Sequence, residues 1–64
     1  MIKVNGEMRD VAEIPIQQYL DENGYKGKCV AVEVNGEIIP RSLHNQTILH
    51  AKDVVEIVSF VGGG

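Results

Sequence analysis

Hydrophobic and polar residues alternate at the start of the chain, which is the pattern of a half-buried β-strand. The alternation covers residues 2–5 and ends at Asn5-Gly6, after which residues 7–11 form a second extended segment. Asn-Gly between two extended segments is a strong signal for a tight hairpin turn. We therefore predict two paired strands, with Met8 or Val11 of the second helping to cover the core.

The segment from Ile14 to Asn23 has the spacing of an amphipathic helix. Three apolar residues fall at positions i, i+3 and i+4 and so share one face. They are Ile16, Tyr19 and Leu20. Pro15 is tolerated in a first helical turn because the N–H that it lacks would be unpaired there. Asn23-Gly24 supplies a left-handed stop, so we predict one helix across this segment.

A second hairpin is predicted in the middle of the chain. Residues 29–34 alternate strictly, with their three valines on one face, as expected of a central strand. Asn35-Gly36 repeats the hairpin signal and returns the chain through residues 37–39. Pro40 ends this short strand because it cannot donate to a ladder. The polar residues 42–46 then predict a turn.

The last strand is the strongest strand signal in the sequence. Residues 54–61 are rich in β-branched side chains, which favour pleated surfaces, and Gly62-Gly63-Gly64 follows. The order of elements fits an α+β fold of the β-grasp (ubiquitin-like) type: a mixed sheet, one main helix on one face, and the first and last strands adjacent at the centre. Other small α+β folds share this order. We expect a β-grasp domain at residues 1–61 and a flexible glycine tail at residues 62–64.

The size and charge of the chain argue against several classes of function. A chain of 64 residues forms a single domain with little room for a deep substrate pocket beside its core, which argues against a self-contained enzyme. The net charge of −3 gives no basic surface for nucleic acid or an anionic membrane. The sequence has no signal-peptide pattern and no apolar run of membrane-spanning length. We expect a soluble, cytoplasmic protein that is a monomer.

Other reactive residues do not form a recognisable site. Cys29, the single cysteine, is expected to act as a small buried hydrophobe. His44 and His50 are too few for a metal site, and a lone Arg41 in a loop is expected to be solvated. Three acidic residues suggest only a polar helix face and no acid–base pair. They are Glu13, Asp21 and Glu22.

The three terminal glycines allow two interpretations. They could be a frayed chain end, since glycines are common there. Alternatively, a tail without Cβ atoms, spanning roughly 10 Å when extended, could thread a narrow channel and deliver its carboxylate to a partner's active site. Activation of such a carboxylate as an acyl-adenylate would let a sulfur nucleophile displace AMP.

Two segments resemble the ThiS family of thiamin-biosynthesis sulfur carriers. They are the N-G-x-I-I-P-R-S stretch within Val34–Ser42 and the E-I-V-x-x-V-G-G-G ending within Asp53–Gly64. The resemblance covers nearly the whole chain. Many relatives carry tryptophan where this chain has His44 and glycine where it has Lys52, and both positions are expected in loops.

The resemblance implies the β-grasp fold and a specific chemistry. A ThiF-type enzyme, using ATP and magnesium, would adenylate the carboxylate of Gly64. Sulfur from a cysteine-derived donor would convert it to a thiocarboxylate, and thiazole synthase would receive that sulfur. Gly62 and Gly63 would thread the partner's active site. The chain itself would bind no cofactor or metal and supply no catalytic residue, so it would be a co-substrate and not an enzyme.

The resemblance also favours a docking surface beside the tail. If Val55 and Ile57 face the helix, then Glu56, Val58 and Phe60 face outward and can contact a partner. In the opposite register, Phe60 would belong to the core. Two other functions stay open: a sulfur carrier like the small subunit of molybdopterin synthase, and a ubiquitin-like module that binds partners non-covalently and never uses its terminus.

Overall fold

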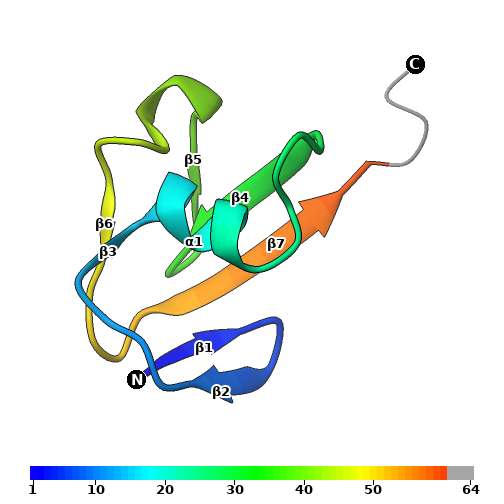
Figure 1. Ribbon diagram of the computed structural model, residues 1–64. Helices are drawn as coiled ribbons and strands as arrows, with labels where there is room; N and C mark the ends of the chain where they lie inside the picture. The colour runs from blue at the N-terminus through cyan, green and yellow to red at the C-terminus, as the bar shows by residue number, and fades with distance from the viewer. Residues whose placement is uncertain (61–64) are drawn as a thin grey trace.

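The computed structural model describes residues 1–60, in which a mixed sheet is covered on one face by a single helix (Figure 1). In chain order the elements are β1 (Ile2–Val4), β2 (Glu7–Arg9), β3 (Ile14–Pro15), α1 (Ile16–Glu22), β4 (Val30–Val34), β5 (Glu37–Ile39), the 3₁₀ helix η1 (Arg41–Leu43), β6 (Ile48–Leu49) and β7 (Val54–Ser59). Five strands form one sheet in the order β2-β1-β7-β4-β5, and β3 pairs with β6 separately. β1 runs parallel to β7, and the other neighbours in the main sheet are antiparallel. The predicted β-grasp arrangement, with first and last strands adjacent, is confirmed.

The core lies between α1 and the inner face of the sheet. The predicted helix residues Ile16, Tyr19 and Leu20 are all buried. Six further buried hydrophobic residues complete the core. They are Ile2, Val4, Val32, Leu49, Val55 and Ile57. The strand residues among them follow the expected alternation, so the pattern of the sequence determined which face of the sheet is buried.

The first hairpin is shorter than predicted. β2 ends at Arg9, and Met8 is 58% exposed because it lies opposite Lys3 on the outer face. The proposal that Met8 covers the core is therefore wrong. Val11 is partly buried and packs against the core cluster, which confirms the other alternative.

The helix begins two residues later than predicted. Ile14 pairs with Leu49 and Pro15 with Ile48, so these two residues form a short strand. Pro15 is the N-cap of α1, with φ −60° and ψ 141°, and is not part of its first turn. The pairing is with a segment far along the chain, so no local signal predicts it. The left-handed stop is confirmed by Gly24, whose φ is +89°.

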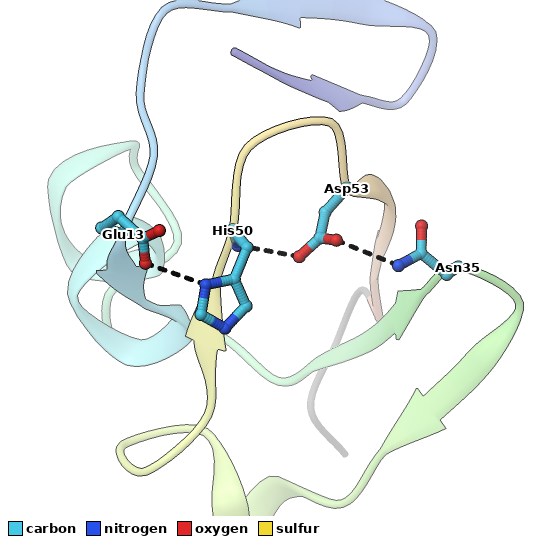
Figure 2. Close-up of polar contacts among 4 residues, drawn as sticks. All are labelled: Glu13, Asn35, His50 and Asp53. Carbon is cyan, nitrogen blue, oxygen red and sulfur yellow. Dashed lines mark hydrogen bonds and ion pairs between the residues drawn. The ribbon is translucent and has the colours of Figure 1, made fainter.

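A line of polar contacts joins three loops at the end of the sheet where β7 begins (Figure 2). Nδ2 of Asn35 donates to Oδ1 of Asp53 at 3.0 Å, and Oδ2 of Asp53 accepts from the backbone N–H of His50 at 2.8 Å. Nδ1 of His50 lies 2.8 Å from Oε2 of Glu13. Oδ1 of Asn35 accepts from the N–H of Val54 at 2.9 Å. These contacts fix the point at which the last strand starts.

His44 has a structural role that the sequence did not indicate. It follows η1 in a loop, as expected, yet it is only 2% exposed. Its Nε2 lies 3.1 Å from the carbonyl oxygen of Ile39, so the buried ring has a polar partner. His44 thus fills a buried position, and it links the end of β5 to the following loop.

Candidate functional site

The base of the glycine tail is anchored to the sheet by β7. This strand pairs with β4 from Val55 to Ser59 and with β1 at its start. Beyond the strand, the N–H of Phe60 still donates to the carbonyl oxygen of Cys29 at 2.9 Å. The chain therefore remains tied to β4 up to the last described residue. Val61 and the predicted tail residues Gly62, Gly63 and Gly64 lie outside the described residues.

The side chains of β7 alternate between the core and the outer face. Val55 and Ile57 are 0% and 6% exposed, whereas Val58 and Phe60 are 56% and 54% exposed. Glu56 is exposed as well. The predicted register is confirmed, and the alternative in which Phe60 belongs to the core is wrong. The helix covers only the opposite face of the sheet (Figure 1), so these side chains are open to a partner.

Cys29 does not have the environment that the sequence predicted. It is exposed, so the expectation of a small buried hydrophobe is wrong. The physical reason is alternation: Val30 and Val32 point towards the core, and Cys29 lies on the other face with Ala31. The valine pattern of this strand contained that signal. Cys29 lies directly beside Phe60 at the base of the tail.

The outer face of the sheet has two rows of side chains near the tail. In one row, Ile38 of β5 lies opposite Glu33 of β4, which lies opposite Glu56 of β7. In the next row, Ala31 lies opposite Val58. We call Glu56, Val58 and Phe60, the residues predicted to contact a partner, the docking surface. It is a mixed apolar and acidic strip that ends at Phe60, the last described residue.

The histidines and acidic residues of the described part of the chain do not form a metal site. Residues 1–60 contain no group of three or more His, Cys, Asp and Glu side chains that could hold a metal ion. The pair formed by His50 and Glu13 is exposed, at 63% and 67%. Arg41 is exposed, as expected. None of these residues lies on the docking surface.

A pocket of about 280 Å³ lies between the first hairpin and the C-terminal end of α1. Its lining is mostly polar and comprises Val4, Asn5, Glu7, Arg9, Tyr19, Asn23 and Tyr25. Burial raises the pKa of the Tyr19 hydroxyl, and the positive charge of Arg9 opposes that effect. The pocket contains none of the residues predicted to act with the tail. No helix in residues 1–60 is long and apolar enough to cross a membrane.

Comparisons with known proteins agree on one family. The ThiS family model matches residues 2–64. The sulfur carrier protein ThiS of Bacillus subtilis is 38% identical over 68 residues, which covers 100% of both chains. A thiazole synthase of Paramagnetospirillum magneticum is 42% identical over 62 residues, covering 95% of this chain but only 19% of that protein. The crystal structure of the thiamine biosynthesis protein ThiS from Geobacter metallireducens superposes with a TM-score of 0.76 at 28% identity, covering 98% of this chain and 97% of the other.

Proposed function

Because this chain belongs to the ThiS family, a family of sulfur carriers for thiamin biosynthesis, we propose that it carries sulfur as a thiocarboxylate on Gly64. The observation that carries the proposal is the match to Bacillus subtilis ThiS over the whole of both chains. The family match extends to Gly64, the last residue of the sequence. In the sequence, Gly64 follows β7, the strand at the centre of the sheet, by five residues.

The chemistry requires activation because a carboxylate is a poor electrophile. A ThiF-type enzyme, supplied with ATP and magnesium, joins the Gly64 carboxylate to AMP and releases pyrophosphate. Hydrosulfide released by a cysteine-derived donor then forms a C–S bond at the Gly64 carbonyl. The C–O bond to AMP breaks, AMP leaves with the electron pair, and the product is the thiocarboxylate. The chain contributes the reacting carboxylate, so it acts as a co-substrate of partner enzymes and binds no cofactor itself.

The glycines suit delivery into an enclosed active site. Gly62, Gly63 and Gly64 carry no Cβ, so a channel around them needs to admit only the backbone. Three extended residues reach roughly 10 Å beyond the residue before them. The hydrogen bond from Phe60 to Cys29 holds the chain in place up to Phe60. A partner on the docking surface would therefore contact the chain just before the tail residues.

Docking on the outer face of β7 would place the partner next to the tail. Val58 and Phe60 offer exposed apolar area, and contiguous apolar side chains on a surface commonly mark binding sites. Glu56 lies two residues before Val58 on the same face and adds a charge that a partner can recognise. The contact would orient the tail before any chemistry begins.

Thiazole synthase is the proposed sulfur acceptor. In Paramagnetospirillum magneticum, a protein named thiazole synthase contains a segment that matches 95% of this chain. That segment is only 19% of the protein, so a carrier-like domain and further sequence share one polypeptide. Covalent linkage raises the effective concentration of one module at the other. The fusion therefore supports a contact between carrier and synthase during sulfur transfer.

The acceptor can be identified by discharge of the loaded carrier. The thiocarboxylate form is mixed with thiazole synthase and its other substrates, or with the large subunit of molybdopterin synthase and its substrate, and the remaining thiocarboxylate is followed by intact mass. The proposal predicts loss of sulfur only with thiazole synthase. Loss only with the molybdopterin enzyme would instead assign the chain to that pathway.

A variant with one residue appended after Gly64 separates a carrier from a non-covalent ubiquitin-like module. The addition leaves residues 1–60 unchanged but moves the carboxylate away from Gly64. A carrier loses loading, whereas a module that never uses its terminus keeps its partner affinity and its function. The proposal treats the chain as a cytoplasmic monomer, since ATP and the cysteine-derived sulfur donor must both reach it.

A further inference from the structure

Two glutamates lie directly opposite each other at the centre of the outer sheet face. Glu33 of β4 and Glu56 of β7 are paired in the antiparallel ladder. Their Cβ atoms are therefore held about 4.5–5.5 Å apart by the sheet itself, and like charges in this relation destabilise a sheet. The repulsion between the two glutamates lowers the stability of a domain that, because of its small size, is only marginally stable.

Within residues 1–60, no ion pair neutralises these two glutamates. The ion pairs within residues 1–60 are Arg9 with Glu7 and His50 with Glu13, and neither includes Glu33 or Glu56. The cation on the same face that is closest by register is Lys3, which lies opposite Val54, two residues along β7 from Glu56. Both carboxylates therefore remain available to a positive charge from outside the chain.

Apolar side chains surround the pair. Ile38, which is 69% exposed, lies opposite Glu33 on its other side. On the outer face of β7, Val54 precedes Glu56 and Val58 follows it, at 45% and 56% exposure. A partner that covers these apolar groups would remove water from around the carboxylates. A charge–charge contact there would be stronger than on an open surface.

We propose that Glu33 extends the docking surface onto β4, and that the Glu33–Glu56 pair binds an arginine or lysine side chain of the adenylating enzyme. A single cation between two carboxylates relieves their repulsion, and a guanidinium can donate to both at once. The charge complementarity favours a partner that has a basic group inside an apolar contact area. It also fixes the orientation in which that partner binds. This inference rests on the proposed function only in taking that enzyme as the partner.

The test compares glutamine variants in binding to the ThiF-type adenylating enzyme. Glu33→Gln, Glu56→Gln and the double variant keep side-chain size and remove the charge. Glu37→Gln is the matched control, because Glu37 is exposed on the neighbouring strand and lies opposite Val34 instead of within the pair. Dissociation constants are measured by calorimetry at low and high salt, with urea unfolding to check that each variant folds.

We expect each single variant to bind about tenfold more weakly than wild type, as for the loss of one close interfacial charge contact. The double variant should also lose most of its salt dependence, while its urea midpoint stays equal to or above that of wild type because the repulsion is gone. Glu37→Gln should bind within about twofold of wild type, as expected for a charge outside the contact.

Two results overturn the inference: a double variant that binds as tightly as wild type, or a Glu37→Gln control that is weakened as much as the double variant. The second result would mean that only net charge matters. Failure of the proposed function is a separate outcome, in which the wild-type chain acquires no thiocarboxylate at Gly64. A wild-type chain that is loaded while the double variant binds normally contradicts the inference alone.

Discussion

The side chain of Asn5 forms both halves of a backbone-like pair with Ile57. Its Nδ2 donates to the Ile57 carbonyl oxygen at 3.1 Å, and its Oδ1 accepts from the Ile57 N–H at 2.7 Å. β1 ends at Val4, so this amide extends the pairing of β7 beyond the end of its neighbour. Asn35, in the other Asn-Gly turn, binds the N–H of Val54 in a similar way. Both turns therefore hold the strand that leads to the tail.

Replacement of Asn5 by glycine should remove this clamp without straining the turn. The φ of Asn5 is +50°, which glycine adopts freely, so in the folded state the variant loses only the amide contacts. Two backbone groups of Ile57 lose their partner, and we expect a loss of about 1–2 kcal/mol in the free energy of unfolding. Urea denaturation measures it. Asn45→Gly, at an exposed loop position, reports the general cost of adding a glycine. If both variants lost the same free energy of unfolding, the Asn5 side chain would not stabilise β7.

Lys52 occupies a backbone conformation that favours glycine. Its φ is +75°, which costs a residue with a Cβ about 1–2 kcal/mol. Lys52→Gly removes that cost but increases the freedom of the unfolded chain, so we expect a net gain of about 0.5–1 kcal/mol. Thermal or urea unfolding measures the change. The same replacement at Lys28, an exposed loop lysine outside the left-handed region, should give no gain. A loss of stability in Lys52→Gly would show that the side chain itself contributes.

Truncation of Phe60 should lower the affinity for the partner, whereas truncation of Ile57 should lower the stability of the fold. Phe60→Ala removes an exposed side chain, so the free energy of unfolding should change by no more than about 0.5 kcal/mol. Its affinity for the adenylating enzyme should fall by about tenfold or more, as for an aromatic contact residue. Ile57→Ala opens the core and should cost about 2–5 kcal/mol. Phe60→Ala with reduced stability and unchanged affinity would rule out the docking role.

Stability should decline at alkaline pH partly because of Tyr19. Burial raises the pKa of its hydroxyl above 10.0, so the folded state retains a proton that the unfolded state has lost. The stabilisation linked to the protonated Tyr19 hydroxyl is fully present below pH 10.0. It disappears as the pH rises through the higher pKa of the folded state. Tyr19→Phe should reduce this alkaline decline relative to wild type, as measured by unfolding at a series of pH values.

The sequence predicted those features that depend on local pattern. Both Asn-Gly turns, the buried face of α1 and the register of β7 follow from spacing and turn chemistry. Features that depend on distant partners were missed. The pairing of Ile14 with Leu49 delayed the start of the helix, and His44 is buried because the end of β5 offers it a carbonyl oxygen.

In the candidate site, too, features set by local pattern were predicted and features set by distant partners were not. Exposure of Val58 and Phe60 followed from alternation, and the exposure of Cys29 could have been predicted from the same rule applied to β4. The opposition of Glu33 and Glu56 required the register between two strands separated by the second hairpin and the η1 loop. Only the structure supplies that register. The tail chemistry came from the resemblance of the Gly-Gly-Gly ending and the P-R-S stretch to one family.

The most direct test of the account is the mass of the chain after incubation with ATP, magnesium, a ThiF-type adenylating enzyme and a cysteine-derived sulfur donor. Intact-mass and fragment measurements locate any change. The account predicts replacement of one oxygen by sulfur, confined to the carboxyl group of Gly64 and absent when Gly64 is deleted. An unchanged mass with active enzyme and donor, or a sulfur located on Cys29 instead of Gly64, would contradict it.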